Sequence, residues 1–492
     1  MNFATILKKR FRKILENAER MSNRRLLSAL LIVTALVAVP LLSVWQVAHA
    51  AGEEVRPLKI QQVLDEAVVT KIFSARRVPQ TLVEAISAGK VQSKLFQVSA
   101  AMPADSCLMI NTEGKNVFAK NTSAALIPGS NQKLLVAAVA LDVLGPDRRF
   151  TTNLLGIVDG STVKGDLWLV GSGDPLLTTR AYPVTEKYPT ITPTDIENLV
   201  DAMVALGITK VDGGVIGDES IYDRERYVPS WGDGIRSVEA GPLGALMIND
   251  GVLTGTPLKP VNPAYGAASE FTKLLQARGI TVRDFPDVGT ASIDTPVIAS
   301  LQSVTMREVV TEMLTNSDNN TAELLVKEIG LAGKNSATRK DGLTVIAEKI
   351  AEWGLPGEGV ALIDGSGLDR DNRLTCNLLV QLLQRDGRAG LVTNSMAIAG
   401  KTGTLRDTFL TGPGTGEMLA KTGTLNGVKS LSGMFPLNDD RSSVFSLIMN
   451  GPGSSTLNFY RPIWNNLASA LAFGNDRIDI RKVQPLSQSA AP

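Results

Sequence analysis

The stretch Pro128-Gly129-Ser130-Asn131-Gln132-Lys133 opens an apolar run from Leu134 to Leu141. The Pro-Gly pair is a turn signal, so we expect Ser130 at a helix start, where backbone N–H groups and the helix dipole favour negative charge. Lys133 follows three residues later, and one helical turn places its amine on the same face as the Ser130 hydroxyl. A serine beside an amine can act as a nucleophile with a built-in base. Because such a pair often arises by chance, as a helix cap and a solvated lysine, the remaining chain must decide.

The histidine count narrows the chemistry that this chain can use. The only histidine among the 492 residues is His49, which lies within the N-terminal segment interpreted below as an export signal. The body of the chain therefore excludes Ser-His-Asp triads, Cys-His dyads and His-ligated zinc. A hydrolase built from it needs a lysine, a carboxylate or metal-bound water as its base, which favours Ser130 and Lys133. We predict no metal site and no cofactor.

The N-terminus has the features of an export signal. Residues 1–25 are basic, residues 26–48 carry no charge, and Ala48-His49-Ala50 has the small-x-small pattern of a signal peptidase site. An uncharged run of this length can also span a bilayer, so residues 1–50 are interpreted as a signal peptide or a membrane anchor, with Met1 or Met21 as the start. Either interpretation exports the rest of the chain and predicts a secreted, cell-wall or periplasmic protein.

Composition describes a globular, mildly acidic body. Apolar residues make up 44% of the chain and charged residues 20%, and 492 residues suffice for two or more domains. Residues 1–50 carry a net charge of +6 and the whole chain +1, which leaves −5 for residues 51–492. This charge gives no electrostatic reason to bind nucleic acid. Cys107 and Cys376 are too few for a disulfide framework, and their spacing leaves their pairing open.

The pattern of apolar and turn residues in the first 300 residues predicts a hairpin followed by a separate α/β segment. Residues 51–80 are interpreted as a charged spacer. Residues 97–120 alternate as strands do, with a turn at Glu113-Gly114-Lys115, and lead into the Ser130 helix. Between 151 and 300, short strand-like runs alternate with Gly/Asp turns and with two helices, near 194–206 and 267–278. The Gly-rich turns lack the strand and helix context of a phosphate loop.

Beyond residue 300 the chain becomes helical and then, from about 391, strand-like. The expected helices cover 306–314, 320–329 and 461–472, and the expected strands cover 428–435 and 443–449.

Two further motifs complete a recognisable set. Ser317-Asp318-Asn319 lies between the two expected helices, and Lys421-Thr422-Gly423-Thr424 precedes an expected strand. S-x-x-K, S-x-N and K-T-G, in this order, are the signature of serine acyl transferases that act on D-alanyl peptides and β-lactams. Over residues of about 95 to 472 the chain resembles the type-4, class C penicillin-binding proteins, which are D-alanyl-D-alanine carboxypeptidases and endopeptidases. The 187 residues between Ser130 and Ser317 agree, because family members insert a domain there.

The resemblance implies an α/β fold of the penicillin-binding transpeptidase-like, β-lactamase-like type. The catalytic domain would comprise residues 81–150 and 301–475, with the inserted α/β domain over 151–300 and a polar tail over 476–492. Larger family members nest a small third domain in the insert. Here Ile248-Asn249-Asp250-Gly251 runs almost directly into the next helix, so we expect that domain to be missing or reduced to a loop.

The resemblance also assigns the catalytic roles. Ser130 would attack the carbonyl of the penultimate D-alanine, and a neutral Lys133 would accept its proton, because burial and a neighbouring ammonium lower a lysine pKa. Ser317 would relay a proton to the leaving amine, and Asn319 would hold Lys133 and the substrate amide. The catalytic set is therefore Ser130, Lys133, Ser317, Asn319 and Lys421.

Substrate binding is assigned to two groups of residues. Lys421, with Thr422, Gly423 and Thr424, would bind the terminal carboxylate. Family members that recognise the free end of diaminopimelate use an acidic residue of the insert and an arginine of the D-G-S-G-L-x-R phrase. Asp223 and Arg370 match these two positions, with a turn aspartate and a surface arginine as the alternatives.

The phrase K-T-G-T-L occurs twice, at Lys401 and at Lys421. The residues after Lys421, from Asn426 to Gly433, match the family's active-site strand. Those around Lys401 resemble a family loop that usually reads A-G-x-D-G-[ST]-L. We therefore assign the active-site lysine to Lys421.

The expected function is trimming or cleavage of peptidoglycan stem peptides through an acyl-serine intermediate, with acylation by β-lactam antibiotics. A β-lactamase shares the three motifs, but the long insert argues against it. A catalytically silent cell-wall scaffold or penicillin sensor is the other alternative, against which the intact motifs argue. The balance between carboxypeptidase and endopeptidase activity, the third residue of the stem peptide and the oligomeric state stay open.

Overall fold

The computed structural model describes residues 23–54, 71–256, 259–438, 440–473 and 482–486. The chain divides into two compact units, residues 1–79 with 483–492, and residues 80–482. The predictions on residues 1–22, on residues 55–70 of the spacer and on most of the tail over 476–492 lie outside the described residues.

In the first unit, the uncharged segment over residues 26–48 lies within helix α2 (Asn23–Glu54). None of the helices in the described part of the chain is both long enough and apolar enough to cross a membrane.

The second unit contains a six-stranded antiparallel sheet in the order β12-β13-β14-β15-β1-β2. Its strands are β12 (Ala397–Ile398), β13 (Leu419–Leu425), β14 (Val428–Pro436), β15 (Ser442–Asn450), β1 (Ser106–Thr112) and β2 (Lys115–Lys120). The predicted strands on both sides of the Glu113 turn and over 428–435 and 443–449 are confirmed.

The strand prediction for Gln97 to Ala100 is wrong, because these residues end helix α3 (Pro79–Ala100). Val91, Leu95 and Val98 follow one another at helical spacing, and all three are buried in a single apolar cluster with strands of the main sheet. Four alternating residues are too few to distinguish a strand from the end of an amphipathic helix.

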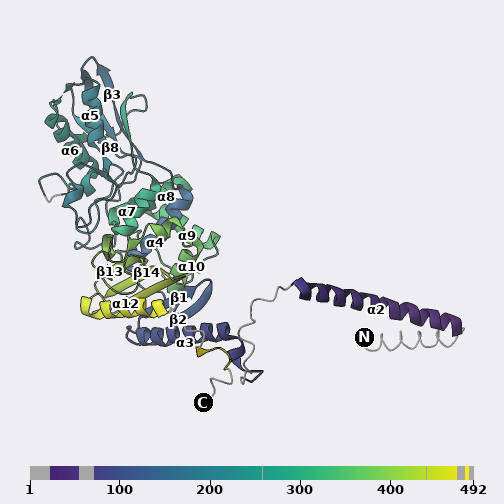
Figure 1. The fold of residues 1–492 in the computed structure, drawn as a ribbon. Helices are drawn as coiled ribbons and strands as arrows, with labels where there is room; N and C mark the ends of the chain where they lie inside the picture. Colours follow the sequence, from purple (N-terminus) through teal and green to yellow (C-terminus); the bar gives the residue numbers. More distant parts are fainter. Residues whose placement is uncertain (1–22, 55–70, 257–258, 439, 474–481, 487–492) are drawn as a thin grey trace, which may run out of the picture. The chain divides into compact units, whose positions relative to one another are not determined.

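Helices cover both faces of the main sheet. Alternate residues of each strand point to opposite faces, so neighbouring residues pack against different helices. Cys107 and Ile448 pack with one group of helices, whereas Leu108 and Leu447 pack with another. The first group comprises α4 (Lys133–Val143), α7 (Met306–Thr315), α8 (Asn319–Lys334), α9 (Arg339–Glu352), α10 (Cys376–Asp386) and α11 (Leu391–Asn394). The second group is α3 and α12 (Leu457–Ala472). Figure 1 shows α4 and α12 on opposite sides of β13 and β14.

The two cysteines form a disulfide across the core. Cys107 lies on β1 and Cys376 is the first residue of α10, their Cα atoms are 6.0 Å apart, and both side chains are fully buried. The bond joins residues 269 positions apart in sequence. Cys107 therefore pairs with Cys376, a pairing that the sequence alone left open.

Residues 151–302 form a second sheet with an apolar core of its own. Its order is β10-β8-β4-β3-β11, with β7 beside β4 and β9 beside β7. The strands are β3 (Thr151–Asp159), β4 (Thr162–Val170), β7 (Lys210–Val211), β8 (Val215–Asp218), β9 (Thr281–Val282), β10 (Asp287–Val288) and β11 (Val297–Gln302). Helices α5 (Glu197–Ala205) and α6 (Pro263–Ala277) pack against the sheet (Figure 1). A two-stranded sheet, β5 (Leu177–Thr178) with β6 (Thr194–Asp195), lies in the same part of the chain.

The first strand of this segment, β3, and its last strand, β11, pair with each other in antiparallel register. The chain therefore enters and leaves the second sheet on neighbouring strands. Within the insert, the short 3₁₀ helix η4 (Asn249–Gly251) is followed by α6 from Pro263 onward. The absence of a nested third domain stays a prediction. The predicted α/β fold class is confirmed by this architecture and by the solved structures reported below.

Candidate active site

Ser130 lies on the 3₁₀ turn η2 (Gly129–Gln132), which leads directly into α4. Gly129 has φ 54°, and a Cβ atom at this position would lie 3.1 Å from Thr424 N of β13. Glycine is therefore favoured where the turn passes the strand. The turn is also held by β14, because the Ser430 hydroxyl donates to the Pro128 carbonyl at 2.6 Å.

Lys133 is fully buried, and its amine lies 3.0 Å from Ser130 Oγ. The one-turn spacing read from the sequence thus brings these two groups into hydrogen-bond contact. The same nitrogen donates to Asn319 Oδ1 at 2.7 Å and to the Ser366 carbonyl at 2.7 Å. Asn319 comes from the S-x-N motif. The Ser366 carbonyl comes from the loop between α9 and α10 and was not predicted.

Two opposing effects act on the pKa of Lys133. Burial lowers its pKa to about 8, while the nearby carboxylates of Asp364, Glu323, Asp318 and Glu239 act in the opposite direction. An amine with this pKa is partly neutral near pH 7, as a general base must be.

Ser317 lies in the left-handed backbone region, with φ 67°, between α7 and α8. Its hydroxyl accepts a hydrogen bond from Lys421 Nζ at 2.7 Å. The next residue, Asp318, caps α8 by accepting from Thr321 N at 2.7 Å. Asn319 donates through its side-chain nitrogen to the Glu239 carbonyl at 2.9 Å, so the insert also helps to hold this motif.

The two K-T-G-T-L copies lie in different surroundings. Lys421 is fully buried, and burial, followed by the charges of Lys133 and Lys429, lowers its pKa well below the usual value. Lys401 is exposed, and its amine donates to the Gly416 carbonyl at 2.9 Å. Lys421 therefore joins Ser317, whereas Lys401 forms a surface contact within its own loop.

Strand β13 approaches the Ser130 turn closely at Gly423. A Cβ atom at Gly423 would lie 2.6 Å from the Pro128 carbonyl and 3.0 Å from Ser130 N. No other residue fits there without displacing backbone. Together with the contact at Gly129, this approach brings the backbone N–H groups of Ser130 and Thr424 to neighbouring positions. Thr422 is buried, whereas the Thr424 side chain is exposed.

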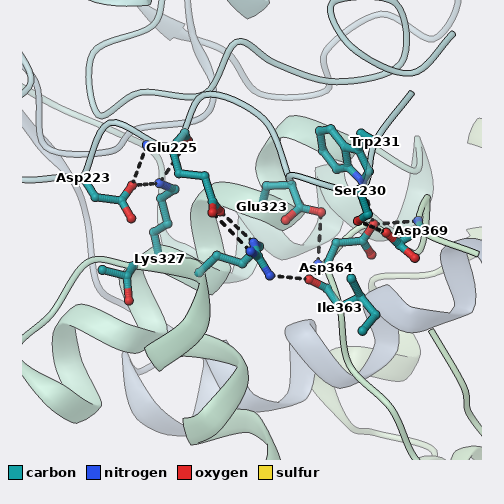
Figure 2. A network of polar contacts seen from close by, with 12 residues as sticks. Asp223, Glu225, Ser230, Trp231, Glu323, Lys327, Ile363, Asp364 and Asp369 are labelled. Carbon is teal, nitrogen blue, oxygen red and sulfur yellow. Dashed lines mark hydrogen bonds and ion pairs between the residues drawn. The ribbon is translucent and has the colours of Figure 1, made fainter. Parts of the chain in front are cut away.

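Two buried carboxylates lie behind Lys133, and the sequence reading assigned no role to either. Glu323 Oε1 accepts from the N–H groups of Gly365 and Ser366, at 3.0 and 2.7 Å, and so fixes the loop whose Ser366 carbonyl binds Lys133. Asp364 accepts from Trp231 Nε1 at 3.0 Å. Figure 2 shows Glu323 and Asp364 within one polar network. The sequence offered one signal for these two residues. Glu323 is an acidic residue within an apolar helix, and Asp364 begins the D-G-S-G-L-x-R phrase.

At another point of this network, Asp223 forms an ion pair with Lys327 of α8, whose side chain is 1% exposed (Figure 2). Asp223 Oδ1 also accepts from Glu225 N at 3.2 Å. Arg370 is exposed and donates to the Asn426 carbonyl at 2.9 Å. In the described part of the chain, Asp223 and Arg370 make no contact with each other. The structure thus gives each of them a local partner.

No group of three or more His, Cys, Asp and Glu side chains suited to hold a metal ion occurs within the described ranges.

Comparisons with known proteins show the family of this chain. A model of the D-Ala-D-Ala carboxypeptidase 3 (S13) family matches residues 91–264 and 254–462. The D-alanyl-D-alanine carboxypeptidase of Actinomadura sp. (strain R39) is 28% identical over 428 residues, covering 69% of this chain and 76% of that protein. Carboxypeptidase DacB of Mycolicibacterium smegmatis is 26% identical over 352 residues, covering 69% and 75% respectively.

Among solved structures, penicillin binding protein 4 (dacB) of Haemophilus influenzae has the same fold. Its TM-score is 0.63 at 19% identity, over 76% of this chain and 98% of that chain. The family match contains all three motifs and most of the second unit. This chain therefore belongs to the D-Ala-D-Ala carboxypeptidase 3 (S13) family and is a serine D-alanyl-D-alanine carboxypeptidase of the type-4 penicillin-binding class.

Proposed function

We propose that Ser130 is the nucleophile of this carboxypeptidase and that Lys133 is its general base. The supporting observation is the set of three oxygen atoms around Lys133 Nζ. The Asn319 Oδ1 and Ser366 carbonyl oxygens can only accept, so they take the two N–H groups of a neutral amine. The lone pair then points to the Ser130 hydroxyl, which can donate its proton as Oγ attacks the peptide carbonyl.

We assign the second proton transfer to Ser317 and Lys421. Lys421 Nζ donates to Ser317 Oγ, so the Ser317 hydroxyl keeps its own hydrogen free. That hydrogen can be donated to the amine of the leaving D-alanine, and Lys421 can replace it. Asn319 completes the catalytic set by orienting Lys133 through its oxygen.

The backbone N–H groups of Ser130 and Thr424 are proposed as the oxyanion hole, a contribution of about 3–4 kcal/mol per donor. The terminal carboxylate of the substrate is assigned to Lys421, Thr422 and Thr424, with Gly423 allowing the close approach of strand and turn. Water then hydrolyses the acyl-serine.

We infer that the substrates are peptidoglycan stem peptides and that β-lactams acylate Ser130 in their place. Relatives named as D-alanyl-D-alanine carboxypeptidases support this inference. In the proposed domain plan, residues 81–150 and 301–475 form the catalytic domain and residues 151–300 the inserted domain. We propose that residues 1–50 contain a signal peptide and that the enzyme acts outside the cytoplasm, where the Cys107–Cys376 disulfide can form.

Release of D-alanine from a muropeptide pentapeptide by the purified chain tests the proposed reaction. We expect free D-alanine, and mass spectrometry after incubation with penicillin should locate one adduct on Ser130. A chromogenic cephalosporin should give a burst followed by slow turnover. Rapid turnover of the cephalosporin would favour a β-lactamase instead, and absence of D-alanine release would favour a silent scaffold.

The two K-T-G lysines provide a matched pair of variants. We expect Lys421→Ala to lower the rate constant for acylation by a labelled penicillin about 100-fold or more, because it removes both the proton donor behind Ser317 and a cation at the carboxylate site. Lys401→Ala, on an exposed loop, should acylate at the wild-type rate. A large loss in Lys401→Ala with retention in Lys421→Ala would overturn the assignment.

The pKa of Lys133 predicts a rising pH profile. The base must be neutral, and below a pKa of about 8 its neutral fraction rises about tenfold per pH unit. The second-order rate constant for penicillin acylation should therefore increase steeply from pH 6 to about pH 8. Stopped-flow measurements with a fluorescent penicillin check this, and a flat profile between pH 6 and 8 would contradict the role of Lys133.

Asp223 and Arg370 are retained as a proposed pocket for the side chain of the third stem residue. The contacts of Asp223 with Lys327 and with Glu225 N both use Oδ1. Because Lys327 is buried, Asp223→Ala should lower the free energy of unfolding by about 2 kcal/mol, less than for a fully buried pair. Asp223→Ala combined with Lys327→Met should recover much of this loss, since no unpaired charge stays buried.

Kinetics separate the two roles of Asp223. If it binds substrate, Asp223→Ala should lower kcat/KM for a diaminopimelate-containing pentapeptide more than for the lysine-containing one. Equal values for wild type and variant on the diaminopimelate peptide would leave Asp223 as the counter-ion of Lys327 alone.

A further inference from the structure

Lys429 is a third lysine near the proposed carboxylate site, and it lies outside the three catalytic motifs, on the strand that follows K-T-G. It lies on β14 directly opposite Thr424 of β13 in the antiparallel register. Its amine donates to Thr424 Oγ1 at 2.7 Å. The residue is 7% exposed, whereas Thr424 is exposed. A buried amine therefore contacts the hydroxyl of an exposed residue.

Two aromatic rings lie close to the Lys429 amine and favour its charged form. Its amine lies 4.1 Å from the ring centre of Tyr460 and 4.8 Å from that of Trp464, both on α12. Such contacts stabilise an ammonium through the ring quadrupole. Within the described residues, neither Lys429 nor Lys421 forms an ion pair with a carboxylate. Burial and the charge of Arg461 lower the pKa of Lys429 to about 8.

The direction of the Lys429–Thr424 hydrogen bond determines what Thr424 can offer to a ligand. An ammonium is a donor only, so Thr424 Oγ1 must accept. The hydroxyl hydrogen of Thr424 is then free to donate outward, and its donor strength is increased because the oxygen is polarised by a positive charge. A hydroxyl prepared in this way binds an anion more strongly than a neutral carbonyl.

We propose that Lys429 is a specificity-determining residue that prepares Thr424 to bind the terminal carboxylate of the substrate. The inference rests on the proposed role of Thr424 in carboxylate binding. Lys429 acts through Thr424 and the local positive potential, together with Lys421, and takes no part in the transfer of the acyl group.

A pair of probes that differ only in charge isolates this role. Benzylpenicillin carries the carboxylate, and its methyl ester does not, while both contain the same reactive amide. We expect Lys429→Met to slow acylation by benzylpenicillin about tenfold and acylation by the ester less than twofold, so that the ratio of the two rate constants falls. Lys429→Arg, which keeps the charge, should restore most of the ratio. Lys401→Met is the matched surface control.

The outcomes are distinguishable. If Lys429→Met slows both probes equally, or leaves the ratio at the wild-type value, Lys429 only packs against α12 and the proposal is overturned. A ratio that falls in Lys429→Met and recovers in Lys429→Arg supports it. Failure of the wild-type chain to form an adduct with either probe would instead refute the proposed function of Ser130.

Discussion

The Lys133→Met variant is expected to lose about 10³-fold in the rate constant for acylation by penicillin, the largest kinetic effect predicted for this chain apart from loss of Ser130 itself. Methionine fills a similar volume but offers no lone pair to the Ser130 proton and no donors to Asn319 and Ser366. The measurement is the rate of adduct formation, followed by mass spectrometry at fixed penicillin concentration.

Two further variants make this result interpretable. Ser130→Ala should form no adduct at all, which sets the background. Lys133→Arg should be nearly as slow as Lys133→Met, because a guanidinium stays protonated and cannot act as a base. Acylation by Lys133→Met within tenfold of the wild-type rate, in a protein that melts like the wild type, would refute the assignment of the base.

Loss of the disulfide is expected to have the largest effect on stability. The bond closes a loop of 269 positions, for which the chain-entropy model gives about 5.6 kcal/mol, and measured losses are usually smaller. The double variant Cys107→Ala/Cys376→Ala should therefore unfold at clearly lower denaturant concentration, with the free energy of unfolding reduced by about 3–5 kcal/mol. Alanine is chosen because both positions are fully buried and serine would add a polar group there.

Wild-type protein measured in reducing agent serves as the matched control and should lose a similar free energy. The acylation rate of the folded double variant should stay close to the wild-type value, because the cysteines lie on β1 and α10, whereas Ser130, Lys133 and Lys421 lie on η2, α4 and β13. A loss below about 1 kcal/mol in the double variant would show that the bond contributes little to folding.

Several elements could be predicted from local patterns. The helices over 306–314 and 320–329 correspond to α7 and α8, and the strands over 428–435 and 443–449 to β14 and β15. Each has a long, unambiguous period of apolar residues. The strand prediction for Gln97 to Ala100 is wrong because four residues fit both the strand period and the helix period. The packing of α3 against the sheet decides for the helix.

In the active site, too, some features follow from local sequence and others from the packing of distant segments. The S-x-x-K spacing is a local property, since one helical turn relates Ser130 to Lys133 wherever the helix lies. Glu323 and Asp364 could not be assigned in the same way, because their roles depend on which distant segments pack against them. The contact between Lys429 and Thr424 depends on the strand register of the β13–β14 hairpin. Asp223 matched a family position, yet its ion pair with Lys327 joins the insert to α8 and has no signature in either segment.

By itself, the sequence determined the chemistry of this protein: a hydroxyl and an amine one turn apart, two further motifs in order, and a body without histidine. These are properties of residue type and short spacing, which the chain carries wherever it folds. Only the tertiary structure decided that Cys107 pairs with Cys376, that the Ser366 carbonyl completes the contacts of Lys133, and which carboxylates face it. Such contacts join segments separated by a hundred residues or more, and they are set by the packing of whole elements.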